Sequence, residues 1–171
     1  MNYNLSFADF SKSILQEIDK YSLDDSIISI FIEIPRIDLI DIYEDLLEDY
    51  SFSSFWEDNN QISYLALGKC ESLNYLGNNK FKFAKKFNDQ IFKKLITINP
   101  YSKRIFFTKL IYFFSFDDKN NKSVSYKSIP SFEAVLPKFL IIKDKKSTYI
   151  SMNIKLLNKN CLLYTSPSPR D

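Results

Sequence analysis

The sequence predicts an α+β fold: a mostly antiparallel sheet with packing helices. Segments rich in Ile, Phe, Tyr and Val, which are typical of strands, are interspersed with segments of helical periodicity. Short turns join consecutive strands, and such strands pair antiparallel because a parallel pair needs a long crossover. Hydrophobic residues make up 45% of the chain and aromatic residues 16%, which is enough for the core of one domain, or of the front half of a larger one.

Three helices are predicted from apolar residues that recur every three or four positions. The first covers residues 7–20, where Ser6 and Asp9 form an N-cap pair. The second covers residues 38–49, with acidic residues opposite its apolar face. The third covers residues 80–98, and its apolar stripe is Phe83, Phe87, Ile91, Leu95 and Ile98. The charge of this helix comes from lysines, namely Lys80, Lys82, Lys85, Lys86, Lys93 and Lys94.

Six strands are predicted where β-branched and aromatic residues gather. They cover residues 27–34, 52–57, 61–69, 104–116, 131–143 and 148–156. Turn residues at 58–60 make a β-hairpin of the second and third strands, and residues 144–146 make the turn between the last two. The predicted order is therefore α, β, α, β, β, α, β, β, β.

The scarcity of glycine and the absence of histidine exclude several classes of function. The only two glycines, Gly68 and Gly77, stand apart, whereas a phosphate-binding loop needs several close together, so no nucleotide motif is present. A chain without histidine has neither Ser-His-Asp nor Cys-His catalysis, and a catalytic zinc site is not expected.

We expect a cytoplasmic protein with no membrane span. Outside the last eleven residues Cys70 is the only cysteine, and a lone thiol cannot form an internal disulfide, which favours a reducing compartment. The first ten residues lack the basic and apolar regions of a secretory signal. The most apolar runs, residues 105–116 and 134–142, are each interrupted by a lysine and are too short to span a bilayer.

Charge is distributed very unevenly along the chain. Residues 1–60 hold fourteen acidic and three basic side chains, a net charge of −11, whereas residues 61–160 hold nineteen basic and six acidic ones, a net charge of +13. A basic half can indicate a nucleic-acid or anionic-membrane partner. We favour the alternative, in which the two halves pack as one domain and screen each other, because the basic half has no recognised nucleic-acid module. No nucleic-acid partner is therefore predicted.

None of the candidate residues assembles a catalytic, cofactor-binding or metal site. Three acidic clusters are candidate metal or acid-base sites: Asp24-Asp25, Glu44-Asp45-Glu48-Asp49 and Asp117-Asp118. The second is expected to be a solvated helix face and the third a polar turn. The lysine-rich helix is expected to face a core with its apolar stripe, although a membrane or nucleic-acid partner stays open. Cys70 is expected to be a buried or neutral thiol and Trp56 a core residue.

The last eleven residues, 161–171, are expected to be foreign to the protein. Their letters, CLLYTSPSPRD, are the translation of one frame of the transposase adapter used to prepare sequencing libraries. Such segments are set aside before fold reasoning because they were never selected to pack with the rest. The alternative is a native, disordered Ser/Pro-rich tail. The predicted organisation is thus a truncated natural part at residues 1–160 and a disordered tail at 161–171.

Five segments, taken in order, resemble motifs of one enzyme family. They are Ile32-Glu33-Ile34-Pro35 with Ile37-Asp38 (family "VEVP" and the start of a helix), Phe55-Trp56-Glu57 ("FYWE"), Ala66-Leu67-Gly68 ("GLG"), Phe114-Ser115-Phe116-Asp117 ("FSFD") and Phe132-Glu133-Ala134-Val135-Leu136-Pro137-Lys138 ("FPxAxLVLPR"). On these, residues 25–155 resemble the N-terminal part of the chorismate-utilising enzymes, in particular the isochorismate synthases of menaquinone and phylloquinone synthesis. Two departures are Ala66 for the first glycine of "GLG", and Tyr112-Phe113 for a Gly-Gly pair before "FSFD".

The resemblance implies an isomerase that converts chorismate to isochorismate. Enzymes of this family use Mg²⁺ to hold the carboxylate of chorismate, a lysine as general base, a glutamate as general acid and further glutamates as metal ligands. In the family these residues lie beyond the last matching segment, so none maps onto residues 1–160. The resemblance therefore implies an incomplete part of the chorismate-utilising fold, inactive by itself and of unknown oligomeric state. Other members, such as anthranilate, aminodeoxychorismate or salicylate synthases, and a non-catalytic binding module with a basic helix remain alternatives.

Overall fold

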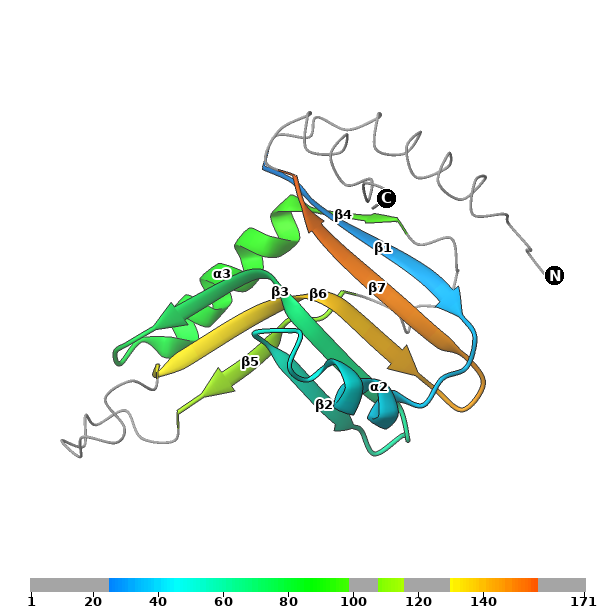
Figure 1. Ribbon diagram of the computed structural model, residues 1–171. Coiled ribbons are helices and arrows are strands. Elements are labelled where there is room, and N and C mark those ends of the chain that lie inside the picture. The colour runs from blue at the N-terminus through cyan, green and yellow to red at the C-terminus, as the bar shows by residue number, and fades with distance from the viewer. Residues whose placement is uncertain (1–24, 99–107, 116–129, 157–171) are drawn as a thin grey trace, which may run out of the picture.

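The computed structural model describes residues 25–98, 108–115 and 130–156, which form a single seven-stranded sheet with two helices (Figure 1). The elements are β1 (Ile27–Ile34), α2 (Leu39–Leu46), β2 (Ser53–Glu57), β3 (Ser63–Tyr75), α3 (Lys80–Lys94), β4 (Leu95–Ile98), β5 (Ile111–Phe114), β6 (Phe132–Lys143) and β7 (Thr148–Lys155). The strand order is β2-β3-β6-β7-β1-β4, and β5 also pairs with β6.

The sheet is mostly antiparallel, as the sequence predicts. β6 is its central strand: β3 pairs along one edge of β6, while β5 and β7 share the other edge. β5 pairs with residues 132–135 of β6, and β7 pairs with residues 139–143 of the same strand. The one parallel pair joins β1 to β4. The α+β prediction is therefore confirmed, whereas the predicted helix at residues 7–20 lies outside the described residues.

The predicted helix over residues 80–98 is wrong at its C-terminal end. α3 ends at Lys94, and Leu95 already has the extended backbone of a strand, with φ −81° and ψ 123°. Residues 95–98 form β4, in which Leu95 pairs with Ile27 of β1. The four residues Leu-Ile-Thr-Ile include three β-branched side chains, and pairing with an available sheet edge outweighs the helical spacing of their apolar positions.

The predicted β-hairpin is confirmed, and its second strand runs further than expected. Asp58 Oδ1 accepts hydrogen bonds from the backbone amides of Asn60 (2.8 Å) and Ile62 (3.0 Å), which closes the turn between β2 and β3. β3 then continues to Tyr75 because its register shifts between Lys69 and Glu71, a β-bulge that bends the strand without ending it. The strand predicted over residues 104–116 is shorter: within residues 108–115 only Ile111–Phe114 is a strand.

The two helices cover opposite faces of the sheet. α3 buries Ala84, Phe87 and Ile91 against a cluster that includes Leu136 of β6, whereas α2 packs over a cluster that includes Ile141 of the same strand. Successive residues of a strand point to alternate faces, so Leu136 and Ile141, five positions apart, lie on opposite faces. Figure 1 shows α2 in front of the sheet and α3 behind β3. The core is thus divided into two layers by the sheet.

Candidate functional site

The segments that carry the resemblance gather on neighbouring strands. Residues 55–57 lie in β2, residues 66–68 in β3 and residues 132–138 in β6, three strands that are adjacent in the sheet. Phe114 ends β5, which pairs with the start of β6, while Phe116 and Asp117 lie outside the described residues. Residues 32–34 of the first resembling segment lie in β1, which is separated from β6 by β7. The fold therefore brings most of these segments to one region of the sheet.

Two of the segments meet at the β-bulge of β3. Gly68 has φ +65°, and its amide donates to the carbonyl oxygen of Phe52 over 2.8 Å. A Cβ at Gly68 would lie 3.2 Å from Cβ of Lys138 and 3.2 Å from Cδ1 of Tyr50. The next residue, Lys69, pairs with Pro137. The glycine of "ALG" is thus required both by its backbone conformation and by the close approach of the "LPK" segment.

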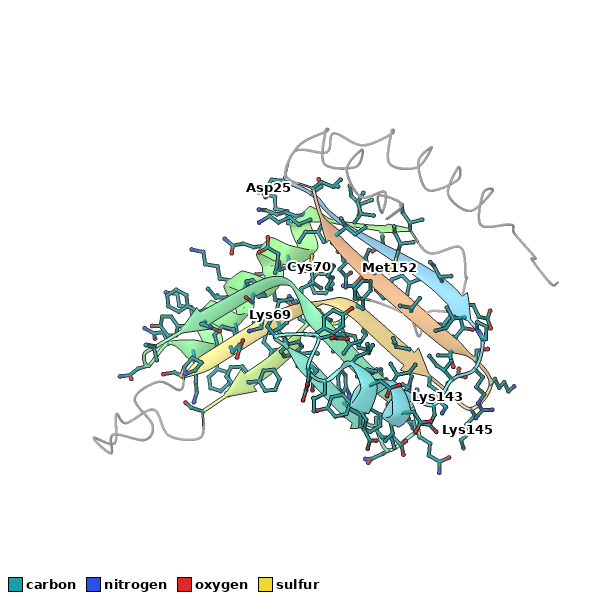
Figure 2. All side chains as sticks on the ribbon, in the orientation of Figure 1. Asp25, Lys69, Cys70, Lys143, Lys145 and Met152 are labelled. Atoms are coloured by element: carbon teal, nitrogen blue, oxygen red, sulfur yellow. The ribbon has the colours of Figure 1, made fainter. Side chains whose placement is uncertain are left out.

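Two lysine-glutamate pairs flank the bulge. Lys69 Nζ lies 2.7 Å from Glu133 Oε1 and 5.7 Å from the centre of the Phe52 ring, and Lys155 forms an ion pair with Glu71. Figure 2 places Lys69 and Cys70 together where β3 bends. No local sequence pattern distinguishes these four charged residues. The partners of the two pairs lie 64 and 84 positions apart in the sequence, so only the sheet, in which β6 lies between β3 and β7, brings them together.

Cys70, between these pairs, is a neutral thiol. Burial, helped by the nearby carboxylate of Glu71, raises the pKa of the Cys70 thiol to about 11. A thiol that stays protonated at neutral pH is a poor nucleophile and a poor metal ligand. The prediction that Cys70 is buried or neutral is confirmed. Trp56, as expected, packs into the core, where its ring stacks on Tyr64 with a centroid distance of 4.9 Å.

Both departures from the family pattern are accommodated by packing. Ala66 is completely buried and pairs with Leu140 of β6, so a methyl group fills the place of a hydrogen. Tyr112 stacks on Phe132, with centroids 6.1 Å apart, and its hydroxyl donates to Asn88 Oδ1 over 3.2 Å. Phe113 stays 43% exposed. In place of two glycines, this chain therefore has a side chain that ties β5 to α3.

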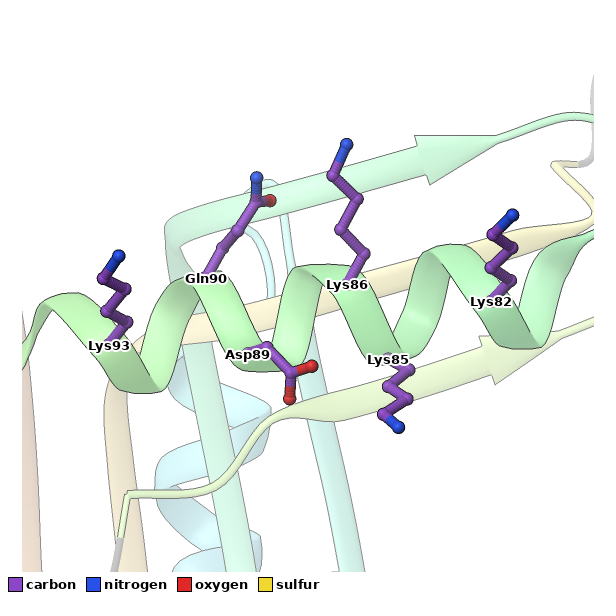
Figure 3. A pocket seen from close by; sticks show the side chains of 6 residues that line it. All are labelled: Lys82, Lys85, Lys86, Asp89, Gln90 and Lys93. Carbon is purple, nitrogen blue, oxygen red and sulfur yellow. The ribbon is translucent and has the colours of Figure 1, made fainter.

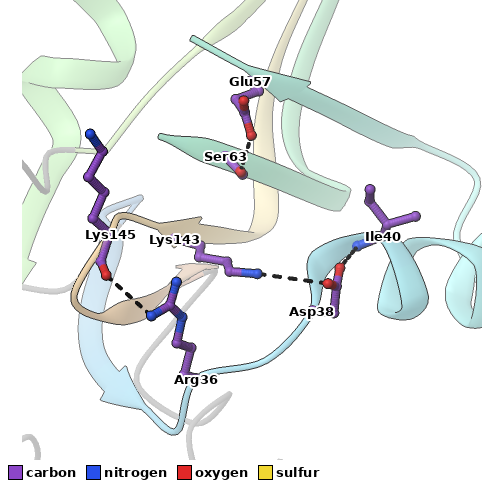
Figure 4. A network of polar contacts seen from close by, with 7 residues as sticks. All are labelled: Arg36, Asp38, Ile40, Glu57, Ser63, Lys143 and Lys145. Atoms are coloured by element: carbon purple, nitrogen blue, oxygen red, sulfur yellow. Dashed lines mark hydrogen bonds and ion pairs between the residues drawn. The ribbon is translucent and has the colours of Figure 1, made fainter. Parts of the chain in front are cut away.

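A polar network fixes the segment that follows β1 (Figure 4). Arg36 donates to the backbone oxygen of Lys145 over 3.2 Å, which joins the end of β1 to the β6–β7 turn. Asp38 caps α2 by accepting from the amide of Ile40 over 2.9 Å, and Lys143 Nζ lies 4.0 Å from the same carboxylate. These contacts position backbone and hold no free acid-base pair, so their role is structural.

The acidic residues that the structure describes do not converge on a common site. The acids of α2 and the turn after it are all exposed, namely Asp41, Glu44, Asp45, Glu48 and Asp49. Asp25 forms an ion pair with Lys94. The hydrogen bond and positive charge of Lys94 lower the pKa of the Asp25 carboxyl by more than desolvation raises it, so this pKa lies below its usual value. Asp24, Asp117 and Asp118 lie outside the described residues. The cluster is solvent-exposed, as predicted, but only Glu44 and Asp45 lie on α2, because the helix ends at Leu46 and not at Asp49; Glu48 and Asp49 lie in the turn after it.

A shallow basic depression lies on the outward face of α3 (Figure 3). It is lined by Lys82, Lys85, Lys86, Asp89, Gln90 and Lys93. Lys80, which the sequence predicts to belong to the charged face of this helix, is buried instead, and its Nζ donates to the backbone oxygen of Ser115 over 2.8 Å. Lys80, Ala84, Phe87 and Ile91 follow one another at spacings of four, three and four, so they lie on the same buried face of α3. This spacing in the sequence could have predicted that Lys80 is buried.

The two charged halves share one sheet but neutralise each other only in part. β1, from the acidic half, pairs with β4 and β7 from the basic half. Two described ion pairs join the halves, Lys94 with Asp25 and Lys143 with Asp38. The exposed acids of α2 and the lysines of α3 lie on opposite faces, however. The two halves therefore pack as one domain, as predicted. The predicted mutual screening does not extend to the acids of α2 and the lysines of α3.

A comparison with family models decides the family. The model of the chorismate binding enzymes matches residues 13–165, which is more than half of the chain and includes every described element. The chain belongs to the chorismate binding enzyme family. No curated protein matches it. The match also includes residues 161–165, the first part of the run expected to be foreign.

For a chorismate binding enzyme, the described residues hold no complete site. Mg²⁺, which the resemblance implies, needs several carboxylates that converge, and no group of three or more His, Cys, Asp or Glu in the described part could hold a metal ion. The glutamates nearest the bulge, Glu71 and Glu133, are each engaged by a lysine. The described residues do not fit the metal, so no catalytic step is derived through it.

No helix in the described part of this family member is a candidate membrane span. The features that the structure does define are the bulge, with its close approach between the "ALG" and "LPK" segments, and the basic face of α3. The first is a scaffold feature of the sheet. The second is a surface whose charge needs a separate explanation.

Proposed function

We propose that this chain is the N-terminal part of an isochorismate synthase, a cytoplasmic isomerase that converts chorismate to isochorismate for menaquinone or phylloquinone synthesis. The observation that carries the proposal is the match of residues 13–165 to the chorismate binding enzymes. The finer assignment rests on the five resembling segments, of which the "FWE" and "LPK" forms fit isochorismate synthases better than the aminating or salicylate-forming members.

The described sheet acts in this proposal as the scaffold on which a catalytic half packs. Residues 69–75 of β3 pair with β6 along one edge, and within the described part β2 reaches only as far as Leu67 along the other. β4 likewise pairs with β1 alone among the described strands. Open edges of this kind accept further strands through backbone hydrogen bonds.

The chemistry is assigned to residues that follow the last matching segment. By resemblance, a lysine activates the attacking water, a glutamate protonates the departing hydroxyl and glutamates hold Mg²⁺. No residue among 1–160 is given a catalytic or metal-binding role. The 171-residue chain is therefore expected to be inactive, and the adapter-like letters of residues 161–171 support a truncation near Asn160.

Sequencing the source DNA across the junction after Asn160 tests the truncation. An open reading frame that continues with a lysine-bearing strand and paired glutamates supports it. A native stop codon close to Asn160, or residues 161–171 encoded in the genome, contradicts it.

Assay of the longer protein tests the reaction. With chorismate and Mg²⁺, isochorismate is the expected product, and activity should disappear on chelation of the metal. An aminated product formed with ammonia or glutamine, or salicylate, would instead identify another member of the family. Turnover by the 171-residue chain itself would refute the assignment of the chemistry to residues beyond it.

A further inference from the structure

The outward face of α3 carries a net positive charge, because four lysines and one acid line its depression. Four of its lysines are exposed: Lys85 and Lys86 lie three and four residues after Lys82, and Lys93 lies seven residues after Lys86. We call them the lysine strip. Within the described part of the chain none of them forms an ion pair, whereas Lys94 of the same helix is paired with Asp25. Asp89 is the single acid among the residues that line this depression.

Exposed apolar side chains border the lysine strip. Phe81 is 69% exposed and Phe92 is 44% exposed. They are eleven residues apart, about three turns of helix, so they project from the same side of α3. Phe81 stacks on Phe114 of β5, which is 40% exposed, with centroids 5.0 Å apart, and Leu76, just before the helix, is 69% exposed. We call these four residues the apolar rim.

We propose that α3 is a docking surface for an anionic phospholipid bilayer, with the lysine strip on the headgroups and the apolar rim at the boundary with the acyl chains. α3 has 15 residues, and Lys82, Lys86 and Lys93 project from one side of it along a nearly straight line that suits a flat surface, whereas Lys85 projects from the other side (Figure 3). Lysines combined with exposed Phe and Leu are the composition of helices that lie in a membrane interface. The proposal does not depend on the isochorismate synthase activity proposed above.

Charge complementarity is local to this face. The whole chain has a net charge of only +2, and the acids of α2 lie on the opposite face of the sheet, so the attraction must come from the lysine strip. A single-stranded nucleic acid fits less well. Bases stack on open aromatic faces, whereas Leu76 has no aromatic face and one face of Phe81 is occupied by Phe114.

Co-sedimentation of the 171-residue chain with lipid vesicles tests the proposal. We expect binding to vesicles of phosphatidylcholine with one quarter phosphatidylglycerol, weak binding to phosphatidylcholine alone, and loss of binding as salt is raised. The double variant Lys82→Gln/Lys86→Gln should lower the partition coefficient about 25-fold, since each lysine near an anionic surface contributes about fivefold. Phe92→Gln should weaken binding roughly tenfold, because the apolar surface of the Phe92 ring would no longer be buried in the membrane interface.

A matched control removes the same charge elsewhere. Lys145 and Lys146 are exposed in the β6–β7 turn, which Figure 1 shows at the end of the sheet away from α3. Lys145→Gln/Lys146→Gln therefore changes the net charge equally and should leave binding within about twofold. Circular dichroism of each variant verifies that it is folded. The proposal is overturned by equal loss in both double variants, or by equal binding to neutral and anionic vesicles. It is also overturned if the chain ignores anionic vesicles yet binds an oligonucleotide, or sediments by self-association without lipid.

Discussion

Replacing Gly68 by alanine tests whether the β-bulge is held by backbone conformation and close packing together. Gly68 has φ +65°, a conformation that costs an L-residue about 1–2 kcal/mol. The added methyl group would lie 3.2 Å from Cβ of Lys138 and 3.2 Å from a ring carbon of Tyr50, so backbone and ring must both shift. Overpacking of this kind adds about 1 kcal/mol at the lower end of its usual range. We expect a loss of about 2–3 kcal/mol in the free energy of unfolding.

Urea denaturation followed by tryptophan fluorescence measures this loss, because the single Trp56 lies in the strand next to the bulge. The corresponding fall in melting temperature is about 4–12 °C for a domain of this size. Gly68→Asn separates the two causes. Asparagine tolerates positive φ better than alanine but carries the same Cβ, so it should recover part of the backbone cost and none of the steric cost. An unfolding free energy for Gly68→Ala within 0.5 kcal/mol of the wild-type value would refute the reasoning.

Two further predictions concern Cys70 and Tyr112. Since burial raises the pKa of the Cys70 thiol to about 11, alkylation of the folded protein should be slow at pH 8, and stability should fall between pH 9 and 11, because there the unfolded thiol loses its proton while the folded one keeps it. Rapid alkylation at pH 8 under native conditions would contradict this; Cys70→Ser is the control for the pH profile. Tyr112→Phe removes the hydrogen bond to Asn88 and should lower the free energy of unfolding by about 1 kcal/mol in urea. Tyr75→Phe leaves that bond in place, and an equal loss in both variants would show that the bond contributes nothing.

Much of the sheet was predictable because its signals are local. β1 has the predicted bounds, 27–34, since a dense isoleucine run is followed at once by a proline. The β-hairpin of β2 and β3 follows from the turn residues at 58–60, and the β6–β7 turn from Asp144, whose Oδ1 accepts from the amides of Lys146 and Ser147 over 2.7 Å. Composition and turn chemistry suffice where the chain reverses within a few residues.

The errors arise where a distant partner decides the conformation. Leu95 continues the apolar spacing of α3, but its partner Ile27 lies 68 positions earlier, and no local pattern reveals an open edge on β1. The end predicted for β3 at Lys69 is wrong for a similar reason. A glycine at position 68 is typical of the end of a strand, but in the sheet Gly68 permits a β-bulge, and β6 pairs with β3 on both sides of that bulge. The lysine-glutamate pairs around this bulge depend on the same long-range pairing.

Charge along the sequence and charge on the surface are different quantities in this protein. Strand pairing mixes the halves, because β1 of the acidic half lies between β4 and β7 of the basic half. The helices undo that mixing, since α2 and α3 pack on opposite faces and carry the densest acidic and basic groups away from each other. Both helices expose apolar side chains, since Ile40 of α2 is 52% exposed and Leu47 at its C-cap is 45% exposed. The two faces therefore differ in the sign of the charge that accompanies the apolar groups and not in their presence. On α3 the lysines lie beside exposed phenylalanines, a combination that water solvates poorly and that an anionic interface satisfies in both parts at once.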